Sequence, residues 1–306
     1  MTAAAGATIL RGMSVRDMAL AVAVVMIWAF TVVAAKAGVA QLPPMLLLAC
    51  RMGLAGLVVV WFVPLPPRRD FPQLLLLAAI LGPLHFGLTI VAVQYIDAGT
   101  ATIGLQTMAP FAALLAWIVF GDAFGWRRAA GMGLAFAGVV LVAGAPTVAG
   151  RWHGVAIILV SAFFFAVYNV LVRRLRPANP AMVNAWVALL SAVLALAASL
   201  AFESGQAAAL HAADWEACGS IVYQGIVATL LGHTLWIRLI GRNGTNLTMP
   251  FTLLMPGFGV VFAVIYFGDP VSWQSLAGGA VTVAGVALII LKPGALRPRK
   301  ARSGHA

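Results

Sequence analysis

One stretch of the chain occurs twice, and this repetition decides the fold. Residues 120–141 read FGDAFGWRRAAGMGLAFAGVVL, and residues 267–288 read FGDPVSWQSLAGGAVTVAGVAL. Phe-Gly-Asp, a tryptophan, two glycines seven residues apart and a leucine recur at a constant offset of 147 residues. The sequence therefore predicts an internal duplication, a feature that determines the architecture of a whole chain.

The duplication extends upstream of this stretch. Matching residues recur at offsets between 137 and 146, which indicates small insertions or deletions in the loops. The pairs are Gly87 and Gly232, Thr89 and Thr234, Gly99 and Gly244, Thr100 and Thr245, Pro110 and Pro256, Pro43 and Pro180, and Met45 and Met182.

The composition gives the setting in which this duplication folds. Of 306 residues, 63% are hydrophobic and 9% are charged, whereas a soluble domain has roughly 45–50% apolar and about 25% charged residues. A soluble globule of this composition would expose apolar surface and aggregate, and a disordered chain is excluded for the same reason. The sequence predicts an integral membrane protein.

Ten apolar segments are long enough to cross a bilayer, which takes about 20 residues of helix. They are continuously apolar, so they are helices and not the shorter, alternating strands of a membrane barrel. Their bounds are 17–35, 45–63, 71–93, 98–120, 127–144, 153–172, 181–202, 216–237, 246–267 and 273–291.

The distribution of basic residues tests this count. If the N-terminus is cytoplasmic and the chain crosses ten times, 16 of the 19 Lys and Arg residues fall on the cytoplasmic side. Only Lys36, Arg51 and Arg151 fall toward the outside. Because cytoplasmic loops carry the excess of positive charge, this partition predicts ten helices with both termini cytoplasmic. The net charge of +11 then reports orientation and not a nucleic-acid partner.

Each copy of the duplication contains five crossings, so the second copy enters the membrane in the opposite orientation. Asp122 precedes the basic pair Arg127 and Arg128, whereas the positions after Asp269 that match this pair are uncharged. We therefore expect an all-α protein made of two inverted-topology five-helix repeats, residues 1–148 and 149–292, followed by a basic cytoplasmic tail, 293–306. This architecture is typical of alternating-access transporters.

The chain resembles the EamA branch of the drug/metabolite transporter superfamily over about residues 17–292. The resemblance rests on the two repeats, Trp28-Ala29, the prolines at 110 and 256, and the Gly-Asp loops at 122 and 269, where the family usually has Gly-Glu. It implies a central cavity lined by helices three, four, eight and nine with parts of one, two, six and seven. Within the family the chain is most similar to bacterial exporters of aromatic and other apolar amino acids, which implies the inner membrane.

Polar residues inside crossings are functional candidates because burying them in lipid is costly. No Asp or Glu lies near the middle of a crossing, so a proton relay through a buried carboxylate is not expected. The alternative is that these side chains join helices to one another. The expected substrate-cavity residues are Trp28, Thr31, His85, Thr89, Thr102, Gln106, Tyr168, Asn169, Thr229, His233, Trp236, Thr248 and Thr252.

Other residues suggest mechanical roles. Pro110 and Pro256 each remove a helix hydrogen bond and are predicted to be hinges, with a static bend as the alternative. The glycine pairs seven residues apart predict close helix packing, either within the chain or in a dimer. Arg51 lies about two turns into its helix, where it either attracts a carboxylate or caps helix carbonyls.

These features together predict a secondary transporter, and not an enzyme, that exports small apolar or aromatic amino acids by alternating access through a mostly uncharged cavity. The expected partners are an amino-acid-like small molecule and the lipid bilayer, in a monomer or weak homodimer without cofactor, metal or catalytic residue. One alternative is a carrier of another metabolite or of a drug cation. Another is a membrane scaffold or enzyme, which would leave the inverted repeat unexplained.

Overall fold

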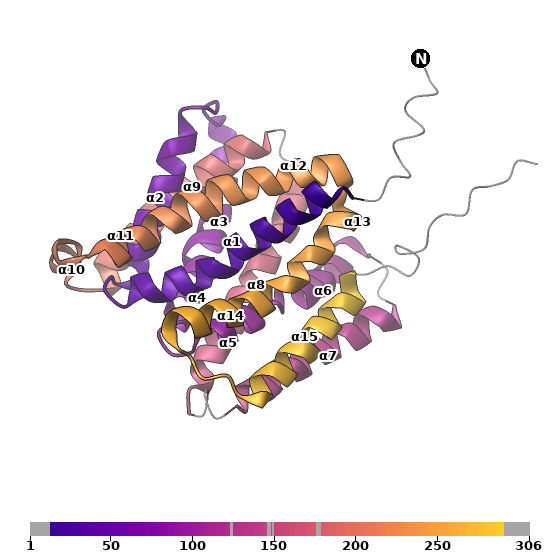
Figure 1. Ribbon diagram of the computed structural model, residues 1–306. Coiled ribbons are helices and arrows are strands. Elements are labelled where there is room, and N and C mark those ends of the chain that lie inside the picture. Colours follow the sequence, from indigo (N-terminus) through magenta and orange to yellow (C-terminus); the bar gives the residue numbers. More distant parts are fainter. Residues whose placement is uncertain (1–12, 123–124, 146–147, 149, 176–178, 291–306) are drawn as a thin grey trace, which may run out of the picture.

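The computed structural model describes residues 13–122, 125–145, 148, 150–175 and 179–290, which form helices joined by short turns (Figure 1). The predicted tail, 293–306, lies outside these residues. The helices are α1 (Val15–Val39), α2 (Pro44–Val60), η2 (Arg68–Asp70), α3 (Phe71–Ala79), η3 (Ile80–Gly87), α4 (Leu88–Ala92), α5 (Ala98–Leu105), α6 (Met108–Phe120), α7 (Trp126–Ala143), α8 (Trp152–Leu175), α9 (Pro180–Phe202), α10 (Gln206–Ala212), α11 (Trp215–Val222), η5 (Tyr223–Gly232), α12 (His233–Asn243), α13 (Thr245–Thr248), η6 (Met249–Leu254), α14 (Met255–Phe267) and α15 (Trp273–Ile290).

The predicted all-α membrane architecture is confirmed. Within the described ranges there are nine helical segments long and apolar enough to cross a bilayer, and no strand. A further apolar helix, α2, has 17 residues, which gives it a length of about 25 Å. Each of the ten predicted segments coincides with one of these helical segments. The largest difference is at the eighth, which continues past Ile237 to Asn243.

Local sequence signals explain where several helices begin. The side chains of Ser14, Asp97, Asn179 and Asp214 accept hydrogen bonds from backbone N–H groups in the first turns of α1, α5, α9 and α11. These side chains satisfy donors that have no partner inside the helix. Pro44 and Pro180, the first residues of α2 and α9, occupy the position where a missing N–H costs nothing. Residues close together in the sequence therefore determine where these helices begin.

The glycine pairs bring α7 and α15 into close contact along their lengths, and the two helices lie side by side in Figure 1. A Cβ on Gly138 would meet the carbonyl oxygen of Gly278 at 2.5 Å, and one on Gly131 would meet that of Gly285 at 2.6 Å. Only residues without a side chain permit this backbone approach. Of the two predicted uses of the glycine face, packing within the chain is the one that the structure contains.

Two of the long segments contain π-helical turns at matching places. The third segment is π-helical over η3, and the eighth over η5, which ends 145 residues later, at the offset of the duplication. Because π-helical turns are rare and frequently lie at functional sites, these turns mark the region in which to look for one.

The fourth and ninth segments are also interrupted at matching depth. The fourth breaks at residues 106–107, between α5 and α6, and the ninth passes through the 3-10 turn η6 before α14 begins. Pro110 and Pro256 both stand in the first turn of the helix that follows the interruption. The backbone therefore changes direction or helix type just before each proline, and whether these points act as hinges stays a prediction.

Candidate functional site

A cluster of three buried polar residues joins the third segment to α8 in the interior of the helix assembly. Nδ1 of His85 lies 3.0 Å from both the carbonyl oxygen and the hydroxyl of Ser161. The hydroxyl of Thr89 lies 2.6 Å from that of Ser161, and all three residues are buried. The predicted His85 and Thr89 therefore belong to one cluster, which joins the first repeat to the second.

A second group joins α1 to the eighth segment. The indole N–H of Trp28 donates to the carbonyl oxygen of Ala228 at 3.2 Å, in the π-helical η5. The Trp28 ring lies 5.2 Å from the ring of His233 and 5.0 Å from that of Trp236, measured between centroids. Trp28, from the first repeat, thus contacts two predicted site residues of the second repeat.

Arg51 of α2 contacts both π-helical turns, η3 and η5. Its Nη1 donates to Oε1 of Gln224, in η5, at 2.5 Å. Its guanidinium carbon lies 4.3 Å from the ring centre of Phe86 in η3, and that ring lies 4.6 Å from the His85 ring. Through Phe86, the Arg51 cation therefore connects the His85 cluster to Gln224 in the eighth segment.

The remaining predicted residues make mainly local contacts. The hydroxyls of Thr31, Thr102 and Thr248 donate to the carbonyl one turn earlier in their own helices, as does the Asn169 amide. Such bonds satisfy the polar group without a partner helix. Thr229 and Thr252 donate to the carbonyls of Gln224 and Met249, Tyr168 stacks on Phe165, and Gln106 lies at the break after α5. Their predicted role in a cavity is not tested by these contacts.

Two fully buried residues of the clusters were missed by the sequence analysis. The Ser161 hydroxyl donates to the backbone carbonyl of His85, and the Ser161 carbonyl lies against the His85 ring nitrogen Nδ1. The Gln224 amide oxygen accepts from Arg51, and its amide N–H donates to the hydroxyl of Ser220. Both are polar residues within apolar runs, the same signal that selected the other candidates. The same rule, applied to every polar residue inside an apolar segment, also selects Ser161 and Gln224.

The helices are packed differently at the two faces of the assembly. We call the face where α1 begins the terminal face, and the one that holds the turn at 40–43 and α10 the far face (Figure 1). At the far face α5 packs against α14, and α1 packs against α4 and α5. Gly259 of α14 approaches α5 so closely that a Cβ there would meet the side chain of Thr102 at 2.6 Å.

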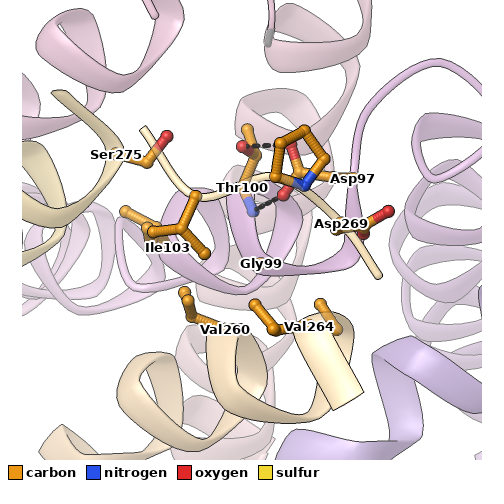
Figure 2. A pocket seen from close by; sticks show the side chains of 11 residues that line it. Asp97, Gly99, Thr100, Ile103, Val260, Val264, Asp269 and Ser275 are labelled. Carbon is orange, nitrogen blue, oxygen red and sulfur yellow. Dashed lines mark hydrogen bonds between the residues drawn. The ribbon is translucent and has the colours of Figure 1, made fainter. Parts of the chain in front are cut away.

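Little space is left in this far-face contact. A cavity of about 20 Å³ lies there, lined by residues of α5, α14, the loop that follows α14 and the start of α15, and Figure 2 shows the side chains that line it. Asp97 accepts hydrogen bonds from the backbone N–H and the hydroxyl of Thr100, both at 2.6 Å. Because a single water needs about 10–15 Å³ of such space, this gap admits little more than one water, and α5 and α14 are closely packed here.

The terminal face lacks such a close contact among the described residues. By the duplication, the counterpart of the α5–α14 contact is a contact of η6 with α6. The counterparts of the contacts of α1 with α4 and α5 are contacts of α8 with α12 and η6. None of these three helix pairs packs extensively. A hollow of about 480 Å³ does open there between η2, α3, α8 and α9, and none of its lining residues belongs to the polar clusters. The described helices are therefore packed more closely at the far face than at the terminal face.

The described part of the chain contains no group of three or more His, Cys, Asp or Glu residues placed to hold a metal ion. The clusters instead offer hydroxyls, amides, aromatic rings and one guanidinium. These groups can bind a small polar or zwitterionic molecule by hydrogen bonds and aromatic contact.

The chain matches known transporters over most of its length. The model of the EamA-like transporter family matches residues 16–144 and again 152–291. A probable amino-acid metabolite efflux pump of Salmonella typhimurium is 31% identical, over 90% of this chain and 94% of that protein. The protein of the same name from Escherichia coli is 29% identical over 94% and 98%.

A more distant relative and a solved structure complete the comparison. A probable terminal-alkyne amino-acid exporter of Streptantibioticus cattleyicolor is 27% identical over 73% of this chain and 74% of that protein. One crystal structure matches with a TM-score of 0.59 and 19% identity, over 89% of this chain and 97% of the other. This last match shows likeness of fold alone.

Proposed function

Because the chain belongs to the EamA-like transporter family, we propose that it is a secondary transporter that exports small apolar and aromatic amino acids, or related metabolites, by alternating access. The observation that carries the proposal is the pair of polar and aromatic clusters where the two repeats meet. The names of the relatives, amino-acid metabolite efflux pumps, support an amino-acid substrate.

The substrate would lie between the two clusters. His85, Thr89 and Ser161 offer hydrogen bonds from one side, and Trp28, His233 and Trp236 offer aromatic surface from the other. Such a mixed wall suits an amino acid with an apolar or aromatic side chain, which needs few polar contacts beyond its ammonium and carboxylate. The remaining candidates, among them Thr102, Gln106 and Thr252, would line the approach to this site.

The unequal packing of the two faces supports alternating access. Inverted repeats can exchange conformations, so that the contacts made at one face are broken there and formed at the other. Residues 1–148 and 149–292 would be the two repeats that exchange. The breaks before Pro110 and Pro256 would be the points at which α6 and α14 change their inclination.

The basic residues set the orientation in this proposal. The terminal face would be cytoplasmic, in the inner membrane of a bacterium, because the excess of Lys and Arg lies in the loops of that face. The described conformation would then be open toward the cytoplasm, ready to take up a substrate for export.

An efflux assay tests the proposal. The purified protein is placed in liposomes loaded with labelled phenylalanine, leucine, threonine or tetraethylammonium, and release of each compound is followed. We expect release of phenylalanine and leucine above that of empty liposomes. Release of tetraethylammonium alone would favour a carrier of drug cations, and release of none of the amino acids would contradict the proposal.

A further inference from the structure

Arg51 is a buried cation without a counter-ion in the described part of the chain. The residue is 3% exposed, and none of the ion pairs formed by the described residues includes it. Its one hydrogen bond there goes to an amide oxygen of Gln224, a neutral acceptor, and its Nε–H is buried with no acceptor. A buried charge normally pairs with an opposite charge, because leaving it unpaired is costly.

The surroundings of Arg51 hold it in place without neutralising it. Gln224 is itself fixed, because its amide N–H donates to the hydroxyl of Ser220, which donates to the carbonyl of Ala34 in α1. The ring of Phe86 covers the guanidinium from the side of η3. None of these contacts goes to a helix-end carbonyl, so the structure does not support the capping role that the sequence left open.

The free edge of the guanidinium has the chemistry of a carboxylate site. An arginine binds a carboxylate through two parallel N–H groups, and the edge that includes Nε is one of the edges suited to this geometry. Nη1, which points to Gln224, lies outside that edge. Both neighbours, Phe86 and Gln224, stand on π-helical turns, a local form frequent at functional sites.

We propose that Arg51 binds the carboxylate of the transported amino acid and thereby selects acids over amines. This inference rests on the proposed function and adds one cationic anchor to an otherwise uncharged site. The single guanidinium fits one carboxylate better than a phosphate group, which usually meets several cations. The His85 ring and the two rings that it contacts, those of Phe86 and Phe165, would accept the apolar side chain.

Gln224→Glu is the decisive variant. It places a carboxylate where the amide oxygen now accepts the bond from Arg51, so the protein itself supplies the missing counter-ion. Because a buried ion pair replaces a buried unpaired charge, we expect the fold to persist while the site is occupied from within. Arg51→Gln removes the cation, and Arg151→Gln removes an exposed loop cation as a matched control for net charge.

Binding is measured as the rise in melting temperature of the purified protein with three probes. Phenylalanine has a carboxylate and an ammonium, phenylacetate only the carboxylate, and phenethylamine only the ammonium. We expect the wild type and Arg151→Gln to respond to the two carboxylates and not to phenethylamine. In Gln224→Glu and Arg51→Gln the apparent affinity for both carboxylates should fall about tenfold to one-hundredfold, the loss expected for a charge-assisted hydrogen-bond pair.

Two results would overturn the inference. One is a Gln224→Glu protein that binds the carboxylates like the wild type. The other is an equal response of the wild type to phenylacetate and phenethylamine, which would mean that the carboxylate is not recognised. A purely structural arginine would lower the melting temperature of Arg51→Gln without changing the preference among the three probes.

Efflux of labelled phenylalanine, followed in parallel, separates this inference from the proposed function. Carboxylate binding that depends on Arg51, without efflux of any amino acid, would retain the carboxylate site and reject the export function. Efflux by Gln224→Glu at the wild-type rate would reject the role of Arg51 and retain the function.

Discussion

Nζ of Lys36 lies 3.0 Å from Oδ2 of Asp269, and this ion pair ties the last turn of α1 to the loop before α15. A counterpart exists at the other face. Arg173 follows Lys36 by 137 residues, Asp122 precedes Asp269 by 147, and Nη1 of Arg173 lies 2.8 Å from Oδ2 of Asp122. Both offsets belong to the duplication, so the two ion pairs are equivalent contacts of the inverted repeats.

The equivalence includes an aromatic ring. Lys36 lies over the ring of Phe267 at 4.6 Å, and Arg173 lies over that of Phe120 at 4.1 Å. Each cation therefore joins the first helix of one repeat to the end of the fourth helix of the other. Both ion pairs are formed in the same conformation, where they hold α1 to α14 and α8 to α6. They therefore do not behave as two gates of which one opens when the other closes.

Neutralising the first pair should destabilise the protein. Lys36 and Asp269 are 23% and 17% exposed, so we expect Lys36→Gln or Asp269→Asn to lower the free energy of unfolding by about 1–2 kcal/mol, between the values for surface and buried pairs. Thermal melting in detergent measures this loss. The exchange Lys36→Asp with Asp269→Lys should restore part of it, and a double variant no better than the single ones would contradict a direct interaction.

The second pair predicts a dependence of stability on pH. The hydrogen bond from Arg173, aided by the nearby charge of Arg128, holds the pKa of Asp122 below its ordinary value. A lowered pKa in the folded state stabilises the fold above the unfolded pKa, about 3.9, and this contribution is lost as the pH falls through the folded pKa. The melting temperature of Asp122→Asn should therefore lie below that of the wild type at pH 7, and the difference should shrink below about pH 4. A constant difference would contradict this account.

The architecture was largely predictable from the sequence because its signals are local or repetitive. Segment length and apolarity locate the helices, the constant offset of Phe120 and Phe267 reveals the duplication, and the spacing of Gly131 and Gly138 predicts a close helix contact. The π-helical turns were not predicted. An extra residue in one turn depends on what packs around it, and Pro83, inside η3, also suits other kinds of kink.

The site was predicted only in part because spacing along one helix says nothing of the partner across from it. Helical spacing placed His85 and Thr89 on one face, but the residue that they share, Ser161, comes from another helix. For the same reason, the sequence alone does not decide whether Arg51 attracts a carboxylate or caps helix carbonyls, because its neighbours Gln224 and Phe86 come from other helices.

The glycine contact between α7 and α15 gives a prediction with an internal control. Gly138→Ala would bring a Cβ against the backbone of α15, which cannot yield as a flexible side chain does, so we expect a loss of about 1–3 kcal/mol. Gly133, on the same helix, has open space where its Cβ would stand, and Gly133→Ala should be neutral or stabilising by up to about 1 kcal/mol. Equal melting temperatures of the two variants would show that α7 and α15 do not pack in this way.

His85 gives a prediction about transport. A carbonyl oxygen only accepts, so the contact of Nδ1 with the Ser161 carbonyl requires the proton on Nδ1, an assignment that follows from the geometry. An asparagine amide N–H stands at nearly the same place as Nδ1 of histidine. We therefore expect His85→Asn to keep this hydrogen bond and most of the efflux of phenylalanine. His85→Leu removes the N–H donor to Ser161, whose hydroxyl keeps its contacts with Thr89 and with the carbonyl of residue 85. We expect it to cost about 0.5–1.5 kcal/mol of stability and to lose efflux.

The same pair of variants distinguishes a positioning histidine from a proton carrier. Asparagine does not titrate, so a transporter that moves protons through His85 would lose its response to a pH gradient in His85→Asn. We expect instead that any gradient dependence of the wild type persists in this variant, because the described contacts use the ring only as a hydrogen-bond donor and aromatic surface. Efflux from proteoliposomes with and without an imposed gradient measures the difference. A His85→Asn protein that still releases phenylalanine but no longer responds to the gradient would assign proton coupling to this ring.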